Sequence, residues 1–225
     1  MRPVILILSC QRDMVKGCND AIRNTWARTS LIPYKFFLGR GATVQHEDEI
    51  AVDADDNTAG LTAKVQASVR WALDAGYTHF FNACTDTYVN TSRLLNSQFE
   101  RADYIGQLPL LSSDIRFCQH GAGFWLSTQA GLLLTGDQSA QFSCPHADDA
   151  WIGEFMASVG IEAVNDPRYS MGQTWHYNQE PVLKTNDIIS CHLSRHSSPE
   201  ALLRRDASLL YDPRWMWEAY EADIG

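Results

Sequence analysis

The sequence of 225 residues has no CxxC pair, no long apolar run and no excess of basic residues. Its longest apolar run, "VILIL" at residues 4–8, is too short for a bilayer span or a typical signal peptide, so we expect no membrane association. The six cysteines are widely scattered, which predicts mostly free thiols in a reducing compartment.

The formal net charge of −9 argues against a general electrostatic attraction to nucleic acid. It does not exclude a local basic groove. The C-terminal part has some positive character, from Arg195, Arg204, Arg205 and Arg214.

Several motifs of nucleotide and hydrolase sites are also missing. The chain has neither a GxGxxG fingerprint nor a Walker P-loop, which disfavours a classical dinucleotide or kinase-type site. It has no Gly-x-Ser-x-Gly elbow either, so nucleophilic hydrolase chemistry has little support.

Strand and helix patterns alternate through the first half of the chain. This alternation predicts an α/β fold with a mostly parallel central sheet flanked by helices, as a single domain over residues 1–225. Strands are expected at 3–9, 34–39, 50–52, 77–83, 103–108 and 187–193, and helices at 16–28, 58–76, 90–100, 146–160 and 199–206.

The stretch "CTDTYVN" places Asp86 where a predicted strand ends. Ligands of open α/β sheets bind beyond the carboxyl ends of the strands, so Asp86 could be a metal or ribose ligand. It could equally cap a helix beginning near Asn90. A divalent ion would need a second ligand, which His192 or the nearby His196 could supply.

Two further stretches have both a structural and a functional interpretation. Asp148 and Asp149 begin a predicted helix, where acids commonly complement the helix dipole. One of them could instead accept a proton from an attacking hydroxyl. In "QHGAGFWLS", Gly121 and Gly123 would permit close backbone approach to a ligand, or simply form a tight turn or bulge.

Taken in order along residues 3–200, these segments resemble the β-1,3-galactosyltransferase and Fringe family of glycosyltransferases. "AIRNTW" is similar to the family's Arg-x-x-Ile-Arg-x-Thr-Trp helix, and "KFFLG" to its Phe-Leu-Leu-Gly strand. Further similar segments are "GLTAKVQASVRW", "CTDTYVN", "HGAGFWLS", "DDAWIG" and "SCHLSRHSSPE". Each motif is weak alone, but their common order makes the set fairly specific.

The resemblance implies a GT-A fold, which has a Rossmann-like sheet and usually works with Mn²⁺ and a UDP-sugar donor. It also implies inverting transfer of a hexosyl group to an acceptor hydroxyl. Carried over by position, Asp86 and His192 are the metal ligands and Asp149 is the general base. Arg23, Lys64, Thr85, Asp86, Gly121 and Gly123 would then lie at the donor site.

One departure from the family pattern concerns the metal motif. Cys84 replaces its first aspartate, and Thr85 occupies the middle position. Neutral cysteine is a poor ligand for a hard cation, so we expect weaker metal binding or a site completed by substrate phosphates. The alternatives are a non-catalytic nucleotide-sugar or glycan-binding module and, with less support, a metal-dependent hydrolase.

The acceptor is the least specified part of the prediction. The chain starts almost at its first strand, without a stem or anchor, as expected of a cytoplasmic enzyme. Its acceptor could be a glycan, a protein, a small molecule or a hydroxymethylated base in DNA. The DNA acceptor would require a basic groove and base extrusion.

Overall fold

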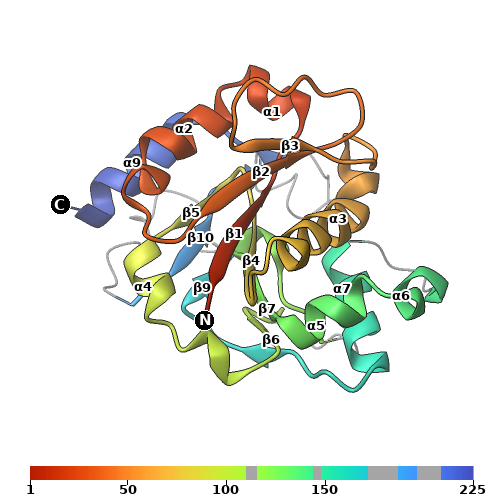
Figure 1. Cartoon of the computed structure of the whole chain (residues 1–225). Helices are drawn as coiled ribbons and strands as arrows, with labels where there is room; N and C mark the ends of the chain where they lie inside the picture. Colours follow the sequence, from red (N-terminus) through yellow and green to blue (C-terminus); the bar gives the residue numbers. More distant parts are fainter. Residues whose placement is uncertain (110–115, 144–147, 172–186, 197–208, 225) are drawn as a thin grey trace.

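The computed structural model describes residues 1–109, 116–143, 148–171, 187–196 and 209–224. Its centre is a seven-stranded sheet in the order β3-β2-β1-β4-β7-β6-β8 (Figure 1). The strands are β1 (Pro3–Leu8), β2 (Tyr34–Leu38), β3 (Glu49–Ala51), β4 (His79–Cys84), β6 (Tyr104–Gly106), β7 (Phe124–Ser127) and β8 (Val164–Asn165).

The half of the sheet that carries β1 is parallel. β1 pairs in parallel with β2 and β4, and β2 pairs in parallel with β3. β7 runs antiparallel to both β4 and β6, whereas β8 is parallel to β6. The predicted α/β class with a mostly parallel central sheet is therefore confirmed.

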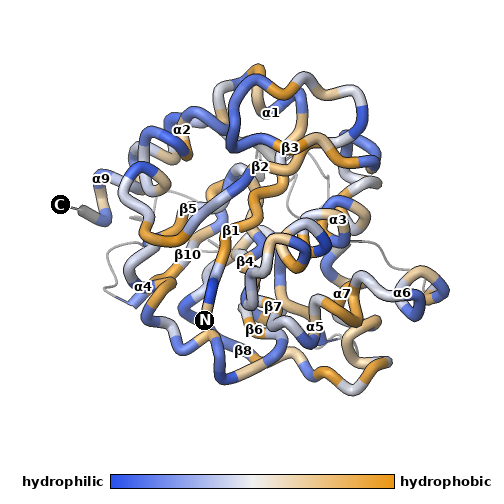
Figure 2. Tube along the Cα trace, in the orientation of Figure 1, coloured by the Kyte–Doolittle hydropathy of each residue, from blue (hydrophilic) through white to orange (hydrophobic). Residues whose placement is uncertain are grey.

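Helices cover both faces of this sheet. One core joins the strands to α2 (Cys18–Asn24), the 3₁₀ turn η1 (Trp26–Thr29) and α9 (Arg214–Ile224). The other joins them to α3 (Leu61–Asp74), α5 (Thr128–Leu134) and α7 (Asp148–Ser158). Because β1 is buried on both sides, it is continuously apolar, as the hydropathy colouring shows (Figure 2).

The chain changes face between β1 and β4. The crossover from β1 to β2 contains α2, whereas the crossover from β3 to β4 contains α3 on the opposite face. This is the topological switch point of the sheet, where the loops beyond two adjacent strands separate and leave a crevice for ligands. The loop after β1 leads into α1 (Gln11–Val15), and the loop after β4 contains Thr85 and Asp86.

A three-stranded sheet lies beside this crevice. It contains β5 (Thr87–Val89), β10 (Ser190–His192) and β9 (Tyr169–Ser170), in the order β5-β10-β9. A short ladder of β11 (Arg195–His196) with β12 (Leu209–Leu210) follows. Short helical elements complete the description: η2 (Thr58–Gly60), α4 (Thr91–Leu95), η3 (Phe99–Arg101), η4 (His120–Ala122) and α6 (Asp137–Gln141).

Two predicted helices differ from the structure in their length. The helix expected at 16–28 is interrupted after α2, because Thr25 leaves the helical conformation and η1 follows. The helix expected at 90–100 ends as α4 at Leu95, and Gln98 then takes a left-handed conformation with φ 59°. The helix predicted at 199–206 lies outside the described residues.

Candidate functional site

The loop after β4 and the end of β10 bring Asp86 and His192 together. Oδ2 of Asp86 lies 3.0 Å from Nε2 of His192 and also accepts a hydrogen bond from the hydroxyl of Ser194. The backbone secures this arrangement, because Thr87 pairs with His192 in the β5–β10 ladder and Leu193 N donates to the Asp86 carbonyl at 2.8 Å. Residues more than 100 positions apart thus form one polar cluster.

Asp86 is held in its ionised form. Burial by itself would raise the pKa of the Asp86 carboxyl, but the charge and hydrogen bond of His192 and the hydroxyl of Ser194 outweigh it, so this pKa is lowered. The Asp86 side chain remains 19% exposed, so it is partly accessible from solvent. It therefore meets the electrostatic requirement for a cation ligand.

The alternative role of Asp86 as a helix cap is not what the structure contains. Helix α4 is capped by Asn90, whose side chain accepts a hydrogen bond from Arg93 N at 2.9 Å. The first turn of α4 is therefore satisfied without Asp86. The polar cluster around Asp86 is separate from the start of that helix.

Gly121 and Gly123 each require glycine, but for different structural reasons. A Cβ at Gly121 would lie 2.8 Å from Cδ2 of His192, so the η4 backbone packs directly against the imidazole ring. Gly123 has φ 81° and faces Phe81, with a Cβ position only 2.3 Å from Cζ. Gly121 thus adjoins the site, whereas Gly123 is required by core packing and backbone conformation.

Asp149 lies in the first turn of α7 and faces the same η4 segment. Its Oδ2 accepts a hydrogen bond of 3.1 Å from His120 N. His120 immediately precedes Gly121, so Asp149, η4 and His192 follow one another along one wall of the crevice. The position suits either helix-end electrostatics or proton transfer, the two roles that the sequence allowed.

The middle of the "CTD" tip points to the loop after β1. Thr85 Oγ1 donates a hydrogen bond of 2.9 Å to Oδ2 of Asp13. Thr87 Oγ1 accepts from Cys84 N and donates to the Gly121 carbonyl, each at 3.0 Å, which fixes the shape of the tip. Sequence patterns did not single out Asp13, and in the segment "SCHLSRHSSPE" they pointed to the histidines and not to Ser194.

Lys64 is a buried residue that organises the loops beyond β1 and β2. Its ammonium donates to the Ser9 carbonyl at 2.8 Å and to Oδ1 of Asp56 at 3.0 Å. Asp56 in turn accepts from the backbone of Gly39 and Gln11, at 2.6 and 2.7 Å. Lys64 therefore supports the floor of the crevice, and its own side chain is only 1% exposed.

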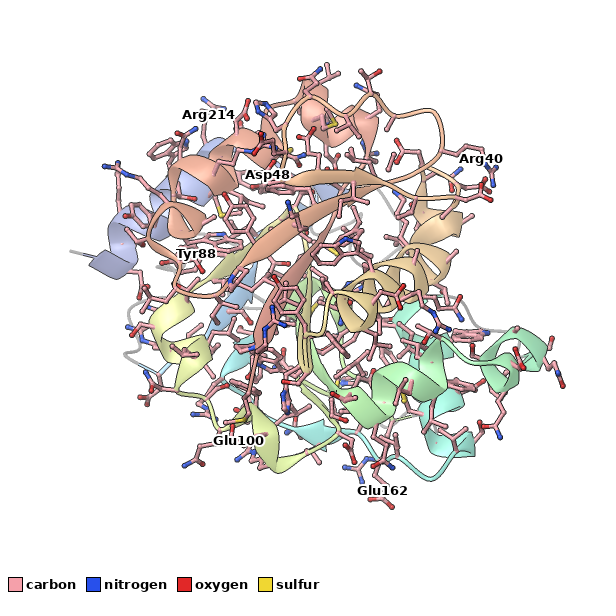
Figure 3. The ribbon with its side chains drawn as sticks, in the orientation of Figure 1. Arg40, Asp48, Tyr88, Glu100, Glu162 and Arg214 are labelled. Atoms are coloured by element: carbon pink, nitrogen blue, oxygen red, sulfur yellow. The ribbon has the colours of Figure 1, made fainter. Side chains whose placement is uncertain are left out.

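Arg23 is engaged in an ion-pair network beside β3. It contacts Asp20 at 2.8 Å, Asp48 at 2.7 Å and Glu49 at 2.6 Å, and its guanidinium lies over the ring of Phe36. Asp48 is labelled above β2 in Figure 3. These contacts are to α2, β2 and the start of β3, and not to Asp86 or His192. Arg23 thus has a clear structural role in linking α2 to β3.

The donor chemistry around Asp86 fits a divalent cation of the Mg²⁺ or Mn²⁺ type. A carboxylate and an imidazole are suitable ligands for Mn²⁺, and such sites usually take one or two carboxylates and complete their coordination with substrate phosphates. Among the described residues, no group of three or more His, Cys, Asp or Glu side chains could hold a metal ion. The two donors present, Asp86 and His192, fit a site that a diphosphate completes.

The arrangement of sheet and crevice is similar to solved glycosyltransferases. The galactosyltransferase LgtC, solved in complex with donor and acceptor sugar analogues, matches with a TM-score of 0.55 at 9% identity, over 97% of this chain and 95% of that chain. An active-site mutant of LgtC matches with a TM-score of 0.50, also at 9% identity and with the same coverage. The chain has a GT-A fold. At this identity the likeness concerns the fold alone.

The GT-A fold confirms that part of the family resemblance, while the Fringe-like specificity stays a prediction. No protein-family model and no curated protein sequence matches the chain. In the part of the chain that the structure describes, every helix is too short or too polar to cross a lipid bilayer.

Proposed function

We propose that this protein is a glycosyltransferase that moves a sugar from a UDP-sugar to an acceptor hydroxyl, with inversion at the anomeric carbon. The pairing of Asp86 with His192 at the switch point of a GT-A fold carries the proposal. It supplies an ionised oxygen donor and a nitrogen donor at the crevice where open α/β sheets bind nucleotides.

In this proposal Asp86 and His192 hold a divalent cation, usually Mn²⁺, against the diphosphate of the donor. The bound cation would neutralise negative charge on the leaving diphosphate. Thr85 precedes Asp86, and the Gly121 backbone packs against His192, so both adjoin the proposed ligands. Lys64 holds the nearby loop after β1 through its hydrogen bond to the Ser9 carbonyl. Arg23 and Gly123, also predicted at the donor site, have the structural roles described above, in an ion-pair network and in core packing.

Asp149 is the proposed general base. It accepts the proton of the acceptor hydroxyl as that oxygen attacks the anomeric carbon from the face opposite the diphosphate. The bond between the anomeric carbon and the diphosphate oxygen breaks, and its electron pair leaves with UDP. The location of Asp149 supports its role as the base, because it accepts a hydrogen bond from His120, the residue before Gly121, which in turn packs against His192.

The acceptor class follows from charge and from the similar structure. LgtC was solved with donor and acceptor sugar analogues, which favours a glycan acceptor here too. The net charge of −9 makes hydroxymethylated DNA the less favoured acceptor. A protein acceptor remains the third class to test.

The test is UDP release from a panel of UDP-sugars, with Mn²⁺ or EDTA, in the presence of glycans, a protein acceptor or hydroxymethylated DNA. Metal-dependent release that one acceptor stimulates supports the proposal, and the anomeric configuration of the product tests inversion. Asp149→Asn should lower turnover by at least about a hundredfold while leaving UDP affinity within about twofold. Equal loss of both would contradict the assignment of the base.

A second candidate is a binding module without turnover. The neutral Cys84 and the lack of a three-member metal group among the described residues favour it. Tight UDP binding with no release from any donor or acceptor, and with a retained sugar on the bound nucleotide, would support this alternative.

A further inference from the structure

A hydrogen bond crosses the crevice at the switch point. β1 and β4 are parallel neighbours, and Leu8 is in register with Cys84 at their carboxyl ends. Asp13, in the first turn of α1 beyond β1, accepts the 2.9 Å hydrogen bond from Thr85 beyond β4. A carboxylate therefore lies between the two loops that define the nucleotide crevice of this fold.

The carboxylate of Asp13 is accessible to a ligand. Its side chain is 19% exposed, the same fraction as that of Asp86. Oδ1 of Asp13 accepts a hydrogen bond of 3.1 Å from Nε of Arg12, whose side chain is 76% exposed, and Asp13 also interacts with the neighbouring Cys10. Ion pairs of this exposed kind are weak, so an incoming hydroxyl can replace Arg12 at little cost.

Asp13 also lies close to the segment that carries Asp86. Its hydrogen-bond partner Thr85 immediately precedes Asp86 in the loop after β4. The contact therefore joins the loop after β1 to the residue next to the proposed cation ligand.

This chain has no carboxylate at position 84, the first position of the strand-end tip. Asp13 places a carboxylate beside that tip from a different loop. The proposed cation ligands are Asp86 and His192, so the contact assigned to Asp13 is with the nucleotide. An acidic side chain at such a crevice is suited to accept hydrogen bonds from ribose hydroxyls.

We propose that Asp13 is the residue that binds the ribose hydroxyls of the nucleotide in this protein. The inference rests on the proposed nucleotide-sugar function and specifies one of its contacts. On binding, the ribose diol donates to the Asp13 carboxylate and displaces Arg12, while Thr85 keeps the carboxylate oriented across the crevice. The position of Asp13 thereby makes the site selective for ribonucleotides.

The experiment compares the binding of UDP and 2′,3′-dideoxy-UDP to the full chain in the presence of Mn²⁺, by calorimetry. The wild type should prefer UDP by about tenfold or more, the size expected for hydrogen bonds to a charged group. In Asp13→Asn the preference should fall to about twofold, through weaker UDP binding with little change for the dideoxy nucleotide. The same comparison with the GDP and ADP pairs covers a different base.

Asp74→Asn is the matched control. Asp74 is exposed at the end of α3. The carbonyl of the next residue, Ala75, accepts a hydrogen bond from Arg2 just before β1, so Asp74 lies near the amino end of β1, away from the carboxyl ends where the site is. It should keep the full preference. Thermal melting of both variants verifies that they are folded.

The outcomes separate this inference from the proposed function. A wild type that binds UDP without preference over the dideoxy form, or an Asp13→Asn variant that keeps the preference, overturns the role of Asp13 alone. Equal weakening of both nucleotides in Asp13→Asn means that Asp13 only orients the loop, which also overturns it. If no nucleotide binds the wild type, the proposed function and this assignment fail together.

Discussion

Gly121 lies so close to His192 that a Cβ at position 121 would be 2.8 Å from Cδ2 of the imidazole. The Gly121 carbonyl also accepts a hydrogen bond from the hydroxyl of Thr87, and Thr87 on β5 is the direct partner of His192 on the adjacent strand β10. The η4 turn and the imidazole therefore form one packed unit. This contact explains why a small residue precedes β7, and it makes the orientation of His192 testable.

Gly121→Ala should move the imidazole of His192 or the η4 turn. We expect the free energy of unfolding to fall by about 1–3 kcal/mol, as for overpacking in a close-packed region, together with weaker Mn²⁺ binding. Urea unfolding measures the first effect, and electron paramagnetic resonance of free Mn²⁺ measures the second. Gly160→Ala is the control, because Gly160 has φ 81° and an open Cβ position: it should lose stability and keep Mn²⁺ affinity. Equal Mn²⁺ affinities of the two variants would refute a role for the Gly121 contact.

Asp86→Ala should lower the affinity for Mn²⁺, measured with UDP present, by at least about tenfold, because it removes the charged oxygen ligand. Ser194→Ala removes only a hydrogen bond to the same carboxylate and should change the affinity by less than about threefold. The same resonance experiment measures both. If Asp86→Ala bound Mn²⁺ as well as the wild type, the cation would have to be held elsewhere.

Lys64→Met should destabilise the protein by about 3 kcal/mol, because it leaves the largely buried carboxylate of Asp56 without its cationic partner. Urea unfolding at neutral pH is the measurement. The control is Arg40→Met, which breaks ion pairs to Asp53 and Asp55 at the surface (Figure 3). It should change stability little. Similar losses in both variants would mean that burial does not distinguish the two pairs.

Stability should decrease when the pH falls below about 4, because carboxylates that are ionised in the folded protein must then be protonated. Burial would raise the pKa of Glu49, but Arg23 and the backbone of Gln45 outweigh it and lower this pKa. Hydrogen bonds from Gln11, Gly39 and Lys64 lower the pKa of Asp56 in the same way against burial. Between the folded and unfolded pKa values the unfolded chain binds more protons, so stability rises with pH there.

Glu49→Gln tests this dependence. Its stability should lie below that of the wild type at about pH 7, and the difference should narrow as the pH falls through the lowered pKa of the Glu49 carboxyl in the folded wild type. Glu100 is exposed, at the lower edge of the molecule in Figure 3, so Glu100→Gln should have the same stability as the wild type at neutral and at acidic pH. A constant difference for Glu49→Gln would assign its effect to packing and not to charge.

The sequence by itself determined the elements whose pattern is local. The uninterrupted apolar residues of β1 predicted a strand buried on both faces, and the helical spacing that ends at Gly76 predicted α3. Their alternation indicated the parallel part of the sheet, and the carboxyl end of β4 indicated the location of Asp86. These predictions succeeded because the direction of side chains along a helix or strand repeats with a fixed local period, which the order of apolar and polar residues reveals.

Only the tertiary structure decided which distant residues meet. The family resemblance predicted that His192 lies with Asp86, but no local pattern shows that Ser194 joins them, that Asp13 accepts a hydrogen bond from Thr85, or that Lys64 is buried beneath the loop after β1. The same holds for Asn90, which leaves Asp86 free of the capping role that the sequence allowed. The physical reason is that these contacts depend on strand order and on the faces that the crossovers take, both of which are set by packing of the whole chain.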